Sequence, residues 1–149
     1  MMVAVMLNEE HVSYDGGCQC SAVRFRGTGT PKWTAHCHCK DCRKPSAAPF
    51  TTYASFANEN FQWIGAAPAV YASSLNVTRR FCGNCGTSMS YESDRWAGET
   101  HIFVATLDDP EALPPRLHAY VVDQLSWVRT DDGLRRYHQT VAEGGPLPK

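Results

Sequence analysis

The chain has 149 residues, with 14 lysines and arginines against 15 aspartates and glutamates and a net charge of −1. This length suits one domain with a substantial core and is short for two. Because the basic residues are dispersed, the sequence lacks the concentrated positive charge that binds nucleic acid, and its apolar runs are too short to cross a membrane.

The chain begins with an apolar run over residues 1–7, which is shorter than a membrane span. This run lacks the basic residues that open a signal peptide, and Asn8, Glu9 and Glu10 follow it. We therefore expect a cytoplasmic protein.

Short runs rich in β-branched and aromatic residues follow one another along the chain, separated by turn residues. In residues 22–27, Val23 and Phe25 face one side and Arg24 and Arg26 the other, which is typical of a half-buried strand. Helical periodicity is almost absent, so the sequence predicts an all-β fold. The predicted strands are 22–27, 34–37, 50–55, 61–64, 69–73, 77–81, 88–91, 101–107 and 117–122.

Two short helical turns interrupt these strands. One is predicted at 39–44, and the other at 108–113, where Asp108 can cap the start and Pro114 ends the helix. Residues 143–149 are rich in glycine and proline and are expected to form a frayed tail. We expect a single domain over 1–149, with a core from about 12 to 130. The cysteines indicate that this domain binds zinc.

The seven cysteines are concentrated in three short clusters. A disulfide framework would need an oxidising compartment and normally has an even number of cysteines. Cysteines that serve only as small apolar core residues would not be spaced as C-x-C, C-x-C-x-x-C and C-x-x-C. The spacing predicts zinc binding by Cys18, Cys20, Cys37, Cys39, Cys42, Cys82 and Cys85.

Four of these cysteines suit a structural zinc. The two-residue gap between Cys82 and Cys85 lets both sulfurs reach one ion, and Gly86 can adopt the positive φ that directs backbone N–H groups at the thiolates. Such a pair needs two further ligands, and Cys18 and Cys20 lie on the same side of an extended segment. Together they would form a closed site that joins distant parts of the chain.

The remaining cysteines, Cys37, Cys39 and Cys42, are close enough in sequence to hold a second zinc, with a fourth position open to water or substrate. Alternatively, His36 or His38 supplies the fourth ligand and both zincs are structural. A residue next to a ligating cysteine in an extended chain points away from the ion. We therefore favour the open site, with His38 behind the ligands or at the surface.

The charge of the open site indicates its chemistry. Zinc with three thiolates carries a net charge of about −1, so it suits a substrate thiolate better than a carbonyl group, and a thiolate beside an aldehyde fits carbon–sulfur bond formation. Nearby cations should offset the added charge. We expect Arg43 and Lys44 to contact the substrate, with Arg79 and Arg80 as further candidates; each could instead be a solvated surface charge.

Aromatic and hydroxyl side chains near the clusters have two interpretations. Phe50, Tyr53 and Trp127 could wall a pocket beside the second zinc, although aromatic residues in a β domain are more often core. Ser46 could hydrogen-bond the substrate or stabilise the turn after the cysteines.

The cysteines lie in three segments whose order and spacing can be compared with known families. These segments are 17–23 (GCQCSAV), 36–44 (HCHCKDCRK) and 80–87 (RFCGNCGT). In order and spacing, residues 14–127 closely resemble the glutathione-dependent formaldehyde-activating enzyme family, which shares its domain with centromere protein V. Ser21 and Ala47 stand where that family usually has glycine.

This resemblance implies an Mss4-like fold of coiled antiparallel β-sheets with two zinc ions per chain. The implied activity is that of a carbon–sulfur lyase that adds glutathione, or a similar small thiol, to formaldehyde or a similar small aldehyde. The alternative is a non-catalytic zinc module that binds thiols or a protein partner. Carried over, the resemblance assigns Cys18, Cys20, Cys82 and Cys85 to the structural ion and Cys37, Cys39 and Cys42 to the catalytic one.

Overall fold

The computed structural model of the chain describes residues 12–147. The expectation for residues 1–7, and the last two residues of the predicted tail, lie outside this range. None of the helices in the described part is long and apolar enough to span a membrane.

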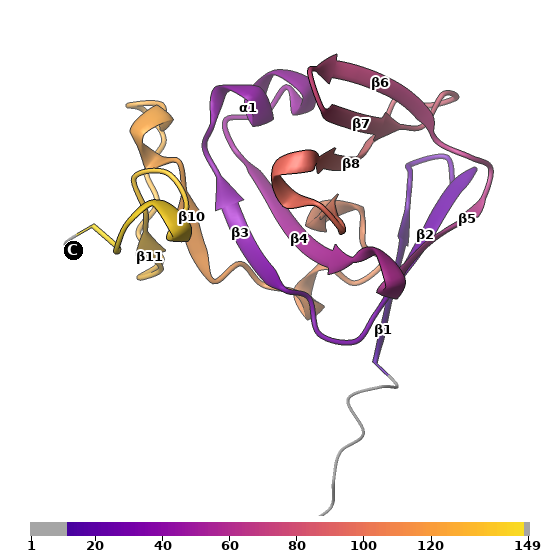
Figure 1. The fold of residues 1–149 in the computed structure, drawn as a ribbon, viewed down its shortest axis with the longest axis horizontal. Coiled ribbons are helices and arrows are strands. Elements are labelled where there is room, and N and C mark those ends of the chain that lie inside the picture. The colour runs from indigo at the N-terminus through magenta and orange to yellow at the C-terminus, as the bar shows by residue number, and fades with distance from the viewer. Residues whose placement is uncertain (1–11, 148–149) are drawn as a thin grey trace, which may run out of the picture.

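The fold consists of a small and a large β-sheet (Figure 1). The small sheet is antiparallel, with the order β1-β2-β5, and comprises β1 (Ser13–Gly17), β2 (Val23–Thr28) and β5 (Phe61–Gly65). The large sheet has the order β11-β10-β3-β4-β9-β8-β7-β6. Its strands are β3 (Trp33–Cys37), β4 (Thr51–Ala57), β6 (Ala69–Ser74), β7 (Val77–Phe81), β8 (Ser88–Ser93), β9 (Glu99–Phe103), β10 (Leu117–Ala119) and β11 (Arg135–Arg136).

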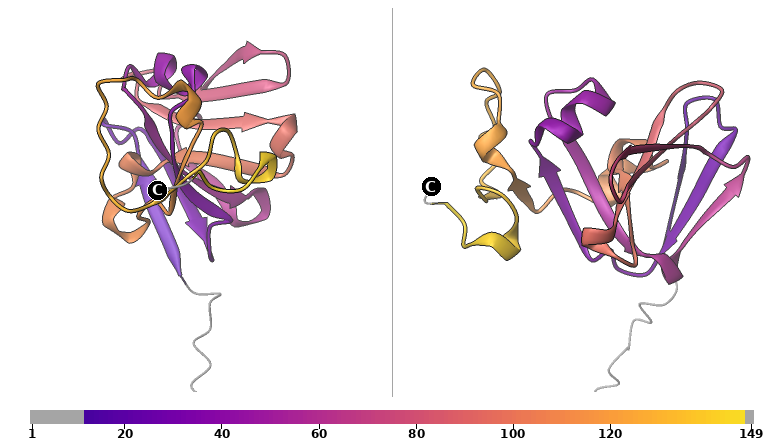
Figure 2. Two further views of the ribbon diagram at one scale, coloured as in Figure 1. Left: turned by 90° about the vertical axis from the view of Figure 1, so that its left-hand side faces the viewer. Right: turned by 45° about the horizontal axis from the view of Figure 1, so that its top comes forward.

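Most neighbouring strands of the large sheet are antiparallel, but β10 pairs in parallel with both β3 and β11. The α-helix α1 (Lys40–Ser46) connects β3 to β4. Figures 1 and 2 place the chain that follows β10 beside β3, on the side away from the small sheet. Short 3-10 helices are formed by Asn58–Asn60, Asp94–Trp96, Val104–Thr106, Pro110–Ala112, Val121–Asp123 and Val141–Glu143.

The core lies between the two sheets. Val23 and Phe25 of β2 are each 1% exposed, which confirms the inward face predicted from their alternation. Phe56 of β4 and Ile102 of β9 belong to the same buried cluster and come from the large sheet. Full burial of a side chain such as Phe25 contributes about 1.5–3 kcal/mol, so this apolar contact stabilises the packing of the two sheets. The mainly β fold predicted from the sequence is confirmed.

Three local predictions need correction. The strand predicted at 101–107 ends at Phe103 and continues as a 3-10 turn. The strand predicted at 117–122 ends at Ala119, because Tyr120 adopts a left-handed conformation with φ 55°. The helical turn predicted at 108–113 is a 3-10 turn at Pro110–Ala112, and Asp108 does not cap it, since its carboxylate accepts hydrogen bonds from Arg24.

Two strands were not predicted. β1 contains Asp15 and two glycines, residues that are rare in strands, and is held by pairing with β2, where Arg26 donates to Asp15 at 2.6 Å. β11 is a two-residue strand at the sheet edge. Within the predicted tail, Glu143 pairs with Arg95, and the backbone N–H of Leu147 donates to the Arg136 carbonyl at 2.7 Å.

Candidate functional site

The structure brings Cys18, Cys20, Cys82 and Cys85 together, with their sulfur atoms all within 4.8 Å of one another. The Cys18 and Cys20 sulfurs are 3.5 Å apart, and those of Cys20 and Cys82 are 3.7 Å apart. Two thiolates that bind one tetrahedral zinc, each at about 2.3 Å, lie about 3.8 Å apart. The donors and their spacing therefore fit a closed four-thiolate zinc site.

Backbone and side-chain donors surround these sulfurs. The N–H of Val23 lies 3.3 Å from the Cys18 sulfur, and that of Cys85 lies 3.5 Å from the Cys82 sulfur. Gly86 adopts a φ of +79°, as expected for the turn after Cys85. The Thr87 hydroxyl, and after it the Thr87 backbone, lower the pKa of the Cys85 thiol to about 5. These contacts favour thiolates, the form that binds zinc.

Cys37, Cys39 and Cys42 form a second group, also with sulfur atoms within 4.8 Å of one another. Cys37 ends β3, Cys39 is the N-terminal cap of α1, and Cys42 lies in its first turn. The Cys37 and Cys42 sulfurs are 3.4 Å apart, and those of Cys39 and Cys42 are 2.7 Å apart. This is closer than thiolates lie around zinc, so an ion would hold the two helix sulfurs further apart.

Cys42 is the most acidic thiol of the second group. Hydrogen bonding with Cys37, and then with Cys39, lowers the pKa of Cys42 to about 4, whereas hydrogen bonding with Cys39, and then with Cys42, raises the pKa of Cys37. The hydroxyls of Tyr53 and Thr51 lie near Cys42 and help to lower its pKa, but both are buried and neither makes a hydrogen bond of ordinary geometry within the described residues. Burial, followed by the Cys42 charge, raises the pKa of Tyr53, so its hydroxyl stays protonated. Because buried polar groups normally make hydrogen bonds, these two hydroxyls can hydrogen-bond a polar group of a substrate that enters beside Cys42.

The second cysteine group opens into a pocket with a volume of about 730 Å³. Aromatic side chains form part of its wall, and its cations are Lys40, Arg79 and Arg95, against the acids Asp41 and Asp123. The aromatic residues that line it are Trp33, Tyr53, Tyr91, Trp96, His101 and Tyr120.

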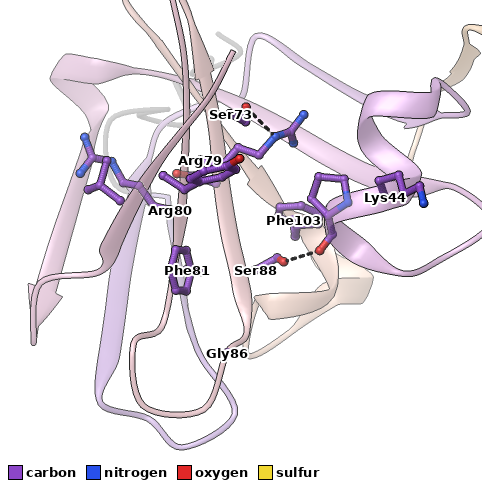
Figure 3. A pocket seen from close by; sticks show the side chains of 12 residues that line it. Lys44, Ser73, Arg79, Arg80, Phe81, Gly86, Ser88 and Phe103 are labelled. Carbon is purple, nitrogen blue, oxygen red and sulfur yellow. Dashed lines mark hydrogen bonds between the residues drawn. The ribbon is translucent and has the colours of Figure 1, made fainter.

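A second pocket of about 560 Å³ lies between the Lys44–Pro45 end of α1 and strands β6 to β8 (Figure 3). Ser88 donates to the carbonyl of Pro45 at 3.1 Å, and Arg79 donates to the Ser73 hydroxyl at 3.1 Å. No cysteine is among its lining residues. The cysteine-lined pocket is therefore the candidate active site.

The cations proposed from sequence have other contacts. Arg43 donates to the backbone carbonyls of His38 and Asp123, so it joins α1 to the chain after β10. Lys44 lines the smaller pocket, and Arg80 pairs with Glu92 at 2.7 Å. Arg79 does line the cysteine pocket, where its guanidinium lies 5.1 Å from the centre of the Tyr91 ring.

Among Ser46 and the candidate aromatic residues, only Tyr53 lines the cysteine pocket. The Ser46 hydroxyl donates to the Cys42 carbonyl at 2.7 Å, which is the turn-stabilising interpretation. Tyr53 is buried and lines the cysteine pocket, whereas Phe50 packs edge-on against His36 with ring centres 4.9 Å apart. Trp127 is 68% exposed and lines neither pocket.

The two histidines beside the second group point elsewhere. His36 Nδ1 lies 2.8 Å from the Thr52 hydroxyl, and His38 Nε2 lies 2.9 Å from His118 Nδ1. Neither histidine belongs to the group formed by Cys37, Cys39 and Cys42. His38 is fully buried rather than at the surface, and this burial, followed by the charge of His118, lowers its pKa to about 4.

Several pocket residues were missed by sequence reasoning. Lys40 lies inside the cysteine cluster and could have been found from that position alone. Arg95 and Trp96 follow β8, and Tyr120 follows β10, without any local pattern that marks them.

The chain is similar to proteins of one known family. A family profile described as glutathione-dependent formaldehyde-activating enzyme matches residues 13–123. An uncharacterized lyase of Schizosaccharomyces pombe is 32% identical over 84 residues, which cover 52% of this chain and 56% of that protein, so only about half of the relative is spanned. A crystal structure of a Rhodobacter sphaeroides protein has a similar fold, with a TM-score of 0.53 at 19% identity, and the match covers 66% of this chain and 93% of that one.

Proposed function

The chain belongs to the glutathione-dependent formaldehyde-activating enzyme family, and on that basis we propose that it is a carbon–sulfur lyase acting on a glutathione-type thiol and formaldehyde or a similar small aldehyde. The observation that carries this proposal is the position of Cys37, Cys39 and Cys42 in the wall of the 730 Å³ pocket. The other four cysteines do not line it.

Two zinc ions are part of this proposal. Cys18, Cys20, Cys82 and Cys85 would hold the structural ion, while Cys37, Cys39 and Cys42 would hold the other. Zinc held there by three thiolates would supply a further coordination position for the substrate thiol and would favour loss of its proton.

The pocket residues would carry the rest of the reaction. The thiol sulfur bonds to the aldehyde carbon, its proton leaves, and the former carbonyl oxygen gains a proton to become the hydroxyl of an S-hydroxymethyl product. The Tyr53 hydroxyl is protonated, buried and without a partner in the described chain, so it can donate to the aldehyde oxygen.

The direct test is the rate at which glutathione and ¹³C-formaldehyde give S-hydroxymethylglutathione, followed by NMR exchange spectroscopy. We expect zinc-loaded protein to accelerate formation and breakdown above the rate in buffer, and Cys42→Ser to remove the acceleration. If glutathione binds without any acceleration, the protein is a non-catalytic thiol-binding module instead.

Arg95 is one of three pocket cations that could bind a substrate carboxylate. It lines the pocket, and its guanidinium already pairs with the Glu143 carboxylate and donates to the Tyr120 hydroxyl at 3.1 Å. Because the side chain is 48% exposed, its contribution should be modest. We expect Arg95→Ala to raise the KM for glutathione roughly five- to tenfold.

The neutral thiol 2-mercaptoethanol serves as the comparison substrate, since it has no carboxylate. Its KM should be unchanged in Arg95→Ala. The matched control is Arg80→Ala, which removes an arginine paired with Glu92 outside this pocket and should affect neither thiol. An equal effect of Arg95→Ala on both thiols would show that Arg95 does not bind the carboxylate.

A further inference from the structure

A third group of metal-ligating side chains contains no cysteine. It comprises His36 on β3, His118 on β10 and Asp132 in the loop before β11, and their candidate ligand atoms all lie within 4.8 Å of one another. We propose that these residues bind a divalent transition metal such as Zn²⁺. This proposal does not depend on the proposed enzymatic function.

The sheet itself places the two histidines together. β3 and β10 run in parallel, and His36 lies directly opposite His118 in their register. Side chains opposite each other on adjacent strands project from the same face. Accordingly, the two imidazole rings have their centres 4.9 Å apart. Asp132 completes the group, with its Oδ2 atom 2.9 Å from His118 Nε2.

Each imidazole has one nitrogen held by a residue outside this group. The Thr52 hydroxyl contacts His36 Nδ1 at 2.8 Å, so His36 Nε2 is the nitrogen that would bind the ion. His38 contacts His118 Nδ1 at 2.9 Å, which leaves His118 Nε2 on the side of Asp132. Metal-binding histidines in proteins are usually oriented by such a contact at the other nitrogen.

The chemistry of the donors selects the class of ion. Two neutral imidazoles and one carboxylate suit zinc and neighbouring transition metals better than calcium or magnesium, which prefer oxygen ligands. The Asp132 side chain is 38% exposed, so an ion can enter and keep water as a further ligand.

A hydrogen-bond chain from Asp132 through His118 to His38 is the alternative explanation. It accounts for the positions of Asp132 and His118, but it leaves the second nitrogen of His36 unused. His38 Nδ1 is buried without a partner in the described residues under either explanation. The two explanations differ at His36, which takes part only in the metal site.

The ion would have a structural consequence for the active site. Asp132 lies beyond residues 13–123, the part of the chain that matches the family. The backbone N–H of Tyr137 donates to the His118 carbonyl at 2.8 Å, and Thr140 and Val141 of the same segment line the cysteine pocket. A metal that joins Asp132 to β3 and β10 would hold this wall of the pocket in place.

The test uses full-length protein with its cysteine sites loaded with zinc and then dialysed against increasing free Co²⁺. We expect one additional ion per chain, counted by mass spectrometry of the metals. Its absorption should consist of d–d bands without the near-ultraviolet charge transfer that thiolate ligands produce. His36→Gln should remove a ligand and leave the Asp132–His118–His38 contacts intact. Loss of a contact outside the ligands costs about 10–100-fold in metal affinity. Loss of a ligand should therefore weaken Co²⁺ binding by more than about 100-fold.

Asp132→Asn should also lose the ion, while Asp131→Asn, which changes the adjacent exposed carboxylate, should retain it. Circular dichroism of each variant checks that the fold is kept. The proposal is overturned if wild-type protein takes up no ion beyond its cysteine sites, or if His36→Gln binds Co²⁺ as the wild type does. Extra binding that shows thiolate charge transfer would assign the ion to the cysteines and would also overturn it.

Discussion

Cys82→Ser is expected to unfold the domain at ordinary temperatures. Cys82 follows β7 of the large sheet and is 1% exposed, and it lies beside Cys18 and Cys20, which connect β1 to β2 of the small sheet. A structural zinc contributes about 10–16 kcal/mol, as much as the 5–15 kcal/mol by which a whole domain is typically stable. Serine is a poor replacement for one of four thiolates, so most of this contribution should be lost.

The measurements are far-ultraviolet circular dichroism, thermal melting and zinc content. Wild-type protein should contain two sulfur-bound zinc ions, of which the four-cysteine ion resists chelators longer because its coordination is closed. The matched control is Cys39→Ser, which changes the pocket group and should leave a folded protein with altered thiol binding. If both variants melt alike, the structural and reactive assignments are wrong.

The grouping of cysteines could be predicted from sequence because it depends on local geometry. Two thiolates separated by one or two residues can meet one ion wherever the segment lies, and the two predicted groups are the ones that the fold assembles. The strand at 77–81 was predicted with its observed bounds for a similar reason, since alternation along a strand is local.

The pocket could not be predicted because long-range pairing creates it. Arg95 becomes a pocket residue only when the chain after β10 packs beside β3 and brings Tyr120 and Glu143 to it. The contacts of Arg43 show the same limit. Its position next to Cys42 indicated a substrate contact, but the fold presents two backbone carbonyls to its guanidinium.

The two departures from the family pattern have a structural meaning. Ser21 has a φ of 63° and Ala47 a φ of 50°, so both hold the left-handed conformation that glycine adopts most readily. This conformation costs a non-glycine residue roughly 1–2 kcal/mol. Ser21 N–H donates to the Cys18 carbonyl at 3.0 Å, and Ala47 N–H donates to that of Lys44 at 3.3 Å, so both turns are kept without glycine.

Glutathione is expected to bind zinc-loaded protein at least about tenfold more tightly than S-methylglutathione, because the methylated sulfur cannot become a thiolate. Binding should release one proton per thiol. A cysteine-type thiol has a pKa of about 8.5, so the apparent affinity should rise about tenfold per pH unit below that value and level off above it. Titration calorimetry in two buffers of different ionisation enthalpy measures the proton directly.

The variants separate sulfur binding from carboxylate binding. Cys42→Ser removes one of the pocket thiolates and should abolish the preference for the free thiol together with the proton release. Arg95→Ala should weaken glutathione and S-methylglutathione by the same factor, because both carry the carboxylates that Arg95 would meet. Indifference of the wild type to S-methylation would reject thiolate binding at Cys37, Cys39 and Cys42. A preference that survives in Cys42→Ser would place the thiol elsewhere in the pocket.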